Sequence, residues 1–178
     1  MRVATIPEFR LRFPLSDVRQ WADRYPDADD SEVEAIGESA RQQGWYTRDQ
    51  FLRVTLWKTE RSKSRCAKNS VATVREITDI ALHATSERLR IGALTLLEGV
   101  QVPTASVLLH LAHREPYPIV DYRALWSLAV DPAPTYYSFE LWWAYTQECR
   151  TLAMEAGVAM RTLDRALWQY SNEHQEPR

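Results

Sequence analysis

The stretch LTLLEGVQVPTASVLLH, residues 94–110, decides the fold that this sequence predicts. It predicts one helix that ends at Leu97, a tight turn over residues 98–101, and a second helix that opens at Val102. Gly99 tolerates the backbone of such a turn and allows another backbone to approach closely. Two helices joined so tightly expose the free N–H groups of the second helix, which can bind a phosphate. By itself, an αα-hairpin is also a common structural element.

Helical signals dominate the rest of the chain. Capping boxes open helices at Ser31 (SEVE, with the helix running to about Gln43) and at Thr47 (TRDQ). Pro103 suits the first turn of its helix. Further helices are predicted over 70–83, 86–97, 103–113, 121–129, 138–156 and 158–172, and the one strand candidate is Val3–Ile6. The segment DPAPT, residues 131–135, marks a connection between helices, so the sequence predicts an all-α protein.

Composition excludes several classes of protein. The chain has 178 residues, of which 45% are apolar and 26% charged, so it is not a disordered chain. Two cysteines, Cys66 and Cys149, cannot build a disulfide scaffold, a zinc ribbon or a four-cysteine iron–sulfur cluster. No stretch has the length and apolarity of a membrane span or a signal peptide. We expect a soluble, cytoplasmic protein without a membrane partner.

The charges are unevenly distributed along the chain. The formal net charge is −2, and residues 15–40 hold 2 basic and 8 acidic side chains. Residues 41–75 hold 9 basic and 2 acidic side chains. A basic block in an acidic chain indicates a surface for an anionic partner. The alternative is a solvated helix face.

A carboxylate follows the hairpin at a characteristic distance. The segment PYPIVDYR, residues 116–123, places Asp121 after a proline-bounded turn, 22 residues beyond Gly99. The pattern L-x-G-V-x-x-x-T-A, an apolar helix and then Val-Asp resembles the helix-hairpin-helix DNA glycosylase superfamily, in its endonuclease III-like group. The resemblance covers roughly residues 48–130.

This resemblance implies a single two-lobed helical domain over residues 1–178. Residues 48–130 would form the hairpin lobe, and residues 1–47 and 131–178 would pack together as the second lobe. In the family, the hairpin backbone binds a DNA phosphate, often with an alkali cation, and the aspartate assists cleavage of the N-glycosidic bond of a flipped base. A carboxylate near the sugar can stabilise the developing positive charge or activate water. The alternative is that Asp121 only caps a helix.

The resemblance assigns site residues by position. The catalytic carboxylate would be Asp121, and the base pocket would hold Trp57, Lys58, Arg61 and Tyr122. The DNA contacts would come from Gly99, Val100, Gln101, Thr104, Lys63, Arg65, Lys68, Asn69 and Arg123. We also expect Asp121 to lie within a few ångströms of Lys58.

The sequence departs from the family in four places. The usual second glycine of the hairpin is Gln101, and the position of the lyase-type lysine is Pro103, which excludes β-lyase chemistry through that position. The usual pocket glutamine and the iron–sulfur cysteines are missing. A monofunctional glycosylase or a non-catalytic DNA-binding module remains, with no cofactor beyond an alkali cation at the hairpin.

The basic segment, which we define as residues 58–69, follows Trp57. Lys58 and Arg61 are expected on one helix face at i and i+3, beside that tryptophan, where an aromatic ring and cations suit stacking on a base. The alternative places Trp57 in the core. A third possibility for the whole chain is a helical protein whose acidic 15–40 segment binds a basic partner.

Two other patterns are interpreted as structural and not as functional sites. His110 and His113 have no acidic partners at ligand spacing, so we predict no metal site. A set of apolar residues at helical spacing near the C-terminus is expected to form core: Trp142, Trp143, Tyr145, Leu152, Met160, Leu163, Leu167 and Trp168.

Overall fold

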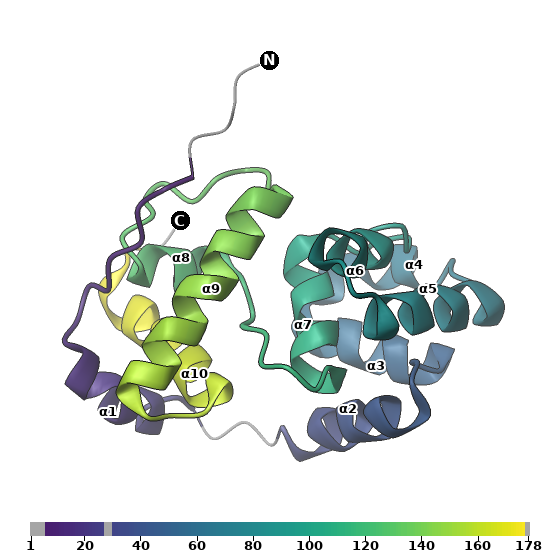
Figure 1. Cartoon of the computed structure of the whole chain (residues 1–178), viewed down its shortest axis with the longest axis horizontal. Helices are drawn as coiled ribbons and strands as arrows, with labels where there is room; N and C mark the ends of the chain where they lie inside the picture. The colour runs from purple at the N-terminus through teal and green to yellow at the C-terminus, as the bar shows by residue number, and fades with distance from the viewer. Residues whose placement is uncertain (1–5, 27–29, 177–178) are drawn as a thin grey trace. The chain divides into compact units, whose positions relative to one another are not determined.

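The computed structural model of the chain describes residues 6–26 and 30–176. These residues form ten α-helices and two short 3-10 helices, with no strand among them (Figure 1). The prediction of an all-α fold is confirmed. The strand candidate Val3–Ile6 lies outside the described residues, apart from Ile6, which belongs to no regular element.

The chain divides into two compact units. The middle unit covers residues 28–117, and the terminal unit combines residues 1–27 with residues 118–178. The borders fall at 27/28 and 117/118, where the sequence had indicated 47/48 and 130/131. They differ because the helix over residues 31–43 packs on the helices of the middle unit, and the helix over residues 122–127 packs on the last helix of the chain.

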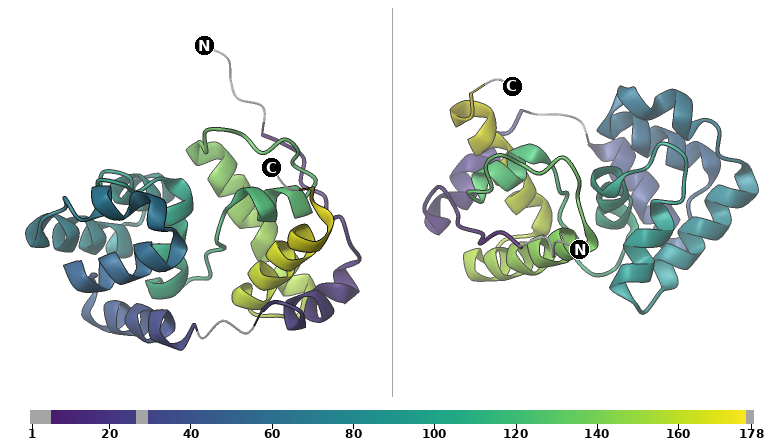
Figure 2. Two further views of the ribbon diagram at one scale, coloured as in Figure 1. Left: turned by 180° about the vertical axis from the view of Figure 1, so that it is seen from behind. Right: turned by 90° about the horizontal axis from the view of Figure 1, so that it is seen from above.

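The middle unit is built around one apolar helix. It contains α2 (Ser31–Gln43), α3 (Arg48–Lys58), the 3-10 helix η2 (Glu60–Ser62), α4 (Lys63–Cys66), α5 (Val71–His83), α6 (Glu87–Leu94) and α7 (Val102–Ala112). Eight of the eleven residues of α7 are buried, and α2, α3 and α6 all contact it (Figure 2). A helix that is apolar on nearly every side must be surrounded in this way.

Local hydrogen bonds define where these helices begin. The predicted capping box at Thr47 is confirmed: the Gln50 N–H donates to Thr47 Oγ1 (3.2 Å), and the Thr47 N–H donates to Gln50 Oε1 (2.9 Å). The capping box predicted at Ser31 is wrong. The N-cap residue of α2 is Asp30, whose carbonyl accepts from the Glu34 N–H, so Ser31 already lies in the first turn.

The terminal unit joins both ends of the chain. It contains η1 (Leu15–Asp17), α1 (Val18–Asp23), α8 (Tyr122–Ser127), α9 (Phe139–Ala156) and α10 (Met160–His174), and both α1 and α8 pack on α10. The N-terminal segment is fixed to the end of α8, because the N–H groups of Arg10 and Arg12 donate to the carbonyls of Leu128 and Ser127. The predicted core set is confirmed for Trp142, Tyr145, Leu152, Met160, Leu163 and Leu167, which are buried, whereas Trp143 and Trp168 are half-exposed.

Candidate nucleic-acid interface

The hairpin turn, residues 98–101, connects α6 to α7. The second helix begins at Val102 as predicted, but α6 ends at Leu94, three residues earlier than expected. The backbone of residues 95–97 continues in turns, and the Val100 N–H donates to the Leu97 carbonyl at 3.1 Å. Gly99 has a φ of +81°. The turn therefore needs the left-handed conformation that glycine adopts without strain.

Gly99 also lies directly against α4. A Cβ atom at this position would be 2.8 Å from Cys66 Sγ, 2.9 Å from the Cys66 backbone nitrogen and 3.0 Å from Arg65 Cβ. These separations are too short for any side chain. The hairpin turn and the basic segment thus form one continuous surface feature of the middle unit.

Asn69 fixes this contact by hydrogen bonds. Its side-chain Oδ1 accepts from the Glu98 N–H (2.9 Å), and its Nδ2 donates to the Glu98 carbonyl (3.0 Å) and to the Cys66 carbonyl (2.9 Å). The residue is 5% exposed. The predicted DNA contact at Asn69 is therefore placed in the interior, where the side chain orients the turn.

Arg48 of α3 holds the other side of the basic segment. Its Nε donates to the Asn69 carbonyl (2.8 Å) and its Nη2 to the Ala67 carbonyl (2.7 Å). The loop after α4 is thereby tied to α3 as well as to the hairpin turn. This role was not predicted from the sequence, where Arg48 counted only as one of the basic side chains.

The cations of α4 and the loop after it are exposed. Lys63, Arg65 and Lys68 are all open to solvent, and no ion pair involves them within the described part of the chain. Three uncompensated positive charges next to a tight turn give this surface a positive potential.

The side chains of the turn divide between the interior and solvent. Val100 and Thr104 are buried, and Gln101 is exposed at the N-cap position of α7 without a side-chain capping bond. Besides its backbone, the turn thus presents the side chains of Glu98 and Gln101 to solvent. The backbone N–H groups at the start of α7 are the part that suits a phosphate.

The predicted pairing of Lys58 with Arg61 on one helix face is wrong. Helix α3 ends at Lys58, and Thr59 takes an extended conformation with a φ of −168°. The side chain of Thr59 then accepts from the Arg61 N–H and opens η2, so Arg61 belongs to a different element. Trp57 and Lys58 are half-buried at the end of α3, and Arg61 is exposed.

Asp121 lies in the terminal unit, at the N-terminus of α8. Its Oδ1 accepts from the Ala124 N–H at 2.9 Å. This is the hydrogen bond expected if Asp121 acts as a helix cap. Asp121 and Lys58 belong to different units, so their expected proximity stays a prediction. The same holds for the predicted base pocket, which combines Tyr122 of the terminal unit with Trp57, Lys58 and Arg61 of the middle unit.

The segment before Asp121 is held by two buried side chains that the sequence did not indicate. The Ile119 N–H donates to Asp164 Oδ1 (3.1 Å), and the Ile119 carbonyl accepts from the Tyr145 hydroxyl (2.9 Å). Burial, reinforced by Cys149, Asp164 and Asp121, raises the pKa of Tyr145 well above 10. The hydroxyl therefore remains protonated and keeps its donor role.

Arginine and aromatic side chains gather beside Asp121. The Arg123 guanidinium carbon lies 5.3 Å from the Tyr122 ring and 5.2 Å from the Trp168 ring. Trp168 in turn contacts Tyr25 edge-on, with 5.2 Å between ring centres. Trp168 was expected in the core, and the periodicity of α10 gave no signal that it would face Arg123.

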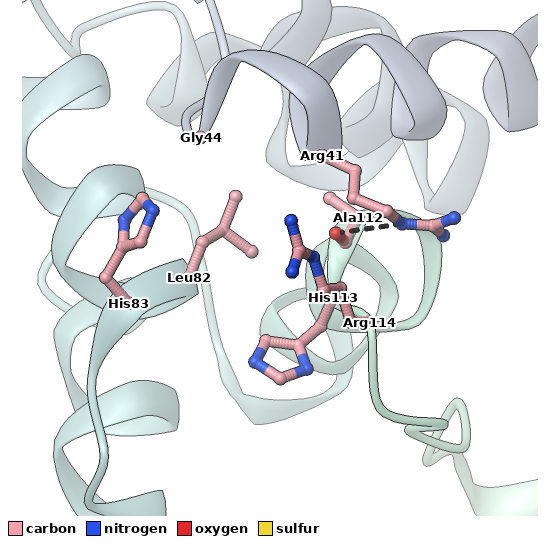
Figure 3. A pocket seen from close by; sticks show the side chains of 7 residues that line it. All are labelled: Arg41, Gly44, Leu82, His83, Ala112, His113 and Arg114. Carbon is pink, nitrogen blue, oxygen red and sulfur yellow. Dashed lines mark hydrogen bonds between the residues drawn. The ribbon is translucent and has the colours of Figure 1, made fainter.

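A cavity of about 320 Å³ lies where α2, α5 and α7 end. Figure 3 shows the Arg114 guanidinium between Leu82 and Arg41, with His83 and His113 at the sides. Arg41 donates to the carbonyls of Leu111 (3.0 Å) and Ala112 (3.3 Å). Arg41 therefore caps the C-terminal end of α7.

His110 and His113 are held by backbone bonds. His110 Nδ1 lies 2.7 Å from the Tyr117 carbonyl, and His113 Nδ1 accepts from the Glu115 N–H at 3.0 Å. Across the described residues, no group of three or more His, Cys, Asp or Glu side chains could hold a metal ion.

The comparisons with known proteins give no relative. No protein-family model, curated protein or solved structure matches this chain. Among the helices of residues 6–26 and 30–176, none is both long and apolar enough to cross a membrane.

Proposed function

We propose that this chain binds DNA through a surface of its middle unit, made of the hairpin turn and the exposed cations of residues 63–68. The observation that carries the proposal is the packing of Gly99 on Cys66 and Arg65. It joins two features that are far apart in sequence and that both suit a phosphate.

The backbone of the turn supplies the first feature. Helix α7 has eleven residues, and its first N–H groups follow the turn without a side-chain cap at Gln101. The positive end of a helix and its unsatisfied N–H groups favour a phosphate. Pro103, which has no N–H, leaves the donors of its neighbours in the first turn.

The charges supply the second feature. The middle unit as a whole has as many acidic as basic residues, so its net charge attracts no polyanion. The local surface does, because Lys63 and Arg65 lie exposed on α4 and Lys68 lies exposed in the loop after it. Binding of this kind is independent of sequence and depends strongly on salt.

The test measures the affinity for duplex DNA over a range of salt concentrations. We expect the variant with Lys63→Gln, Arg65→Gln and Lys68→Gln to lower the log–log salt slope by about 0.9 for each phosphate that it no longer neutralises. Glu98→Gln, which removes an exposed carboxylate from the turn, should tighten binding.

The matched control is Arg114→Gln. Arg114 is an exposed cation of the same unit that follows the C-terminal end of α7, whereas the hairpin turn precedes its N-terminal end. It should leave the slope unchanged. An equal decrease in both variants would show only a general charge effect, and an unchanged slope in the triple variant would assign the basic segment to a solvated face.

A second candidate function is hydrolysis of an N-glycosidic bond with Asp121 as the catalytic carboxylate. The observation in its favour is the double hydrogen bond to Ile119, by which the buried Asp164 and Tyr145 fix the backbone two residues before Asp121. A panel of duplexes with one modified base each, scored for abasic sites, tests the activity.

Asp121→Asn keeps a capping oxygen and removes the charge. DNA binding should survive, and base release should fall by a factor on the order of 10² or more. Pro103→Lys should not by itself create a strand-cleaving lyase, because an amine at this position would also need a base pocket built around it. Equal base release by the wild type and Asp121→Asn would leave Asp121 as a cap and favour the non-catalytic module.

A further inference from the structure

We propose that the terminal unit carries a second DNA surface, specific for unpaired nucleotides, formed by arginine and aromatic side chains of α8 and α10 together with Tyr25. The inference rests on the proposal that the chain binds DNA, and it adds the form of DNA that is recognised. The surface, which we call the arginine–aromatic surface, consists of Tyr25, Tyr122, Arg123, Arg161, Arg165 and Trp168.

The geometry of α10 brings its three members together. Arg161, Arg165 and Trp168 follow one another at i, i+4 and i+7, so they share one face of the helix. The guanidinium carbons of Arg161 and Arg165 lie 5.5 Å and 5.6 Å from the Tyr25 ring. Tyr25 also contacts Trp168 edge-on, so it connects the two arginines to this tryptophan.

Helix α8 adds the remaining two members. Arg123 lies near both the Tyr122 ring and the Trp168 ring, at 5.3 Å and 5.2 Å. It is half-exposed, and the described residues offer it no ion pair. Its contacts within this surface are thus the two aromatic rings.

Arginines are concentrated among the members of this surface. The terminal unit has more acidic than basic residues, yet three arginines occupy this one face. A local concentration of cations indicates an anionic ligand.

The aromatic rings define which anion this is. All six side chains are half-exposed, so the rings are accessible in part while their edges are supported by neighbours. Bases stack on such rings only when they are not already stacked inside a duplex, and guanidinium groups beside the rings bind the phosphates that connect them. A paired duplex offers phosphates but no free base faces. The surface therefore fits a single strand or an unpaired nucleotide.

The experiment compares three labelled probes by fluorescence anisotropy: a thymidine single strand, a fully paired duplex and a duplex with one unpaired thymidine. Arg123→Gln should weaken binding of the two probes with unpaired bases by about tenfold and leave the paired duplex within twofold. Arg161→Gln tests the same surface from α10. The matched control is Arg150→Gln, which removes a guanidinium from the Trp143 ring on α9 of the same unit and should change none of the affinities.

A spectroscopic readout separates stacking from general charge. Bound single strand should quench tryptophan fluorescence, and Trp168→Phe should remove part of that quenching while the fold, followed by thermal unfolding, is retained. Unchanged single-strand affinity in both Arg123→Gln and Arg161→Gln would overturn the inference, as would an equal decrease in affinity for all three probes.

The two proposals fail in different ways. If the triple variant of residues 63–68 no longer binds the duplex and Arg123→Gln binds the single strand like the wild type, only the second surface is wrong. If the wild type binds the single strand through Arg123 and does not bind the duplex, the hairpin surface is wrong. Absence of binding to every probe would overturn both.

Discussion

Asn69 holds the peptide backbone of Glu98 from both sides, as acceptor for its N–H and as donor to its carbonyl. The two residues are 29 positions apart, and this pair of bonds sets the angle at which the hairpin turn leaves α6. A side-chain amide is the one neutral group with a donor and an acceptor at the right separation for this task. The contact helps the turn to keep its shape with Gly99 as the one glycine among residues 98–101.

We expect Asn69→Ala to lower the free energy of unfolding by about 2–4 kcal/mol, because it leaves two polar groups of Glu98 without a protein partner. Urea unfolding measures this change. Lys68→Ala, one residue earlier and exposed, should stay within about 0.5 kcal/mol of the wild type. Similar values for the two variants would show that the Asn69 bonds contribute no net stability.

Gly99→Ala should destabilise the protein by about 3 kcal/mol. An alanine here must adopt a left-handed backbone conformation, which costs free energy. Its Cβ would also overlap Cys66 and Arg65. Gly157→Ala is the matched control, since Gly157 also has a positive φ, +60°, but nothing lies within 4 Å of an added Cβ. Its cost should be about 1–2 kcal/mol. The difference between the two variants isolates the contact between the turn and α4, and no difference would mean that α4 moves aside freely.

Tyr145→Phe should lower stability by about 1–2 kcal/mol, because the buried Ile119 carbonyl loses its donor. The control is Tyr170→Phe, which removes a hydroxyl bonded to the Arg12 carbonyl (3.1 Å) in an exposed position. Water can replace that donor, so the control should change stability by less. Thermal unfolding of both variants provides the comparison, and a larger decrease for Tyr170→Phe would contradict the role given to Tyr145.

The stability should depend on pH through His113. Burial, and then the charge of Arg90, lowers the pKa of His113 below its ordinary value of 6.5. Between the two pKa values, the folded state therefore binds fewer protons than the unfolded state. The contribution of neutral His113 to stability is fully present above pH 6.5 and is lost as the pH falls through the folded-state pKa. Glu115 and Glu87, which raise this pKa, only reduce the effect.

Denaturant midpoints of the wild type and His113→Gln across this pH range test the prediction. The variant should be the less sensitive of the two to acid. His83, which is exposed and lies near Asp79, serves as the control position through His83→Gln. Parallel curves for the wild type and His113→Gln would show that His113 does not titrate differently on folding.

The sequence predicted most helices because their signals are local. The capping box of Thr47 lies within four residues. Pro103 and Gly99 each indicate a local backbone conformation, the first turn of a helix and a tight turn. The short helices α1 and α4 were missed, since neither has a side-chain capping bond and four or six residues show no periodicity. The break at Thr59 was missed for the opposite reason: the helical spacing of Lys58 and Arg61 continues through it.

The candidate site was predictable only in part. The hairpin and the basic segment were identified separately, but nothing in their spacing indicated that they touch through Gly99 and Asn69. Asn69 was assigned to DNA because its neighbours are basic, while its burial depends on a partner 29 residues away. The side chains behind Asp121 lie 26 and 45 residues from Ile119. Such contacts follow from packing, which a single sequence does not reveal.

The two ends of the chain meet in one unit, and this has a consequence for synthesis on the ribosome. Everything that the middle unit needs has been translated by residue 117, including α7, on which α2, α3 and α6 pack. Helix α1 is made first but must wait for α10, its main packing partner, which is made last. The nascent chain therefore folds from its middle outwards, and α1 remains without its partner through most of translation.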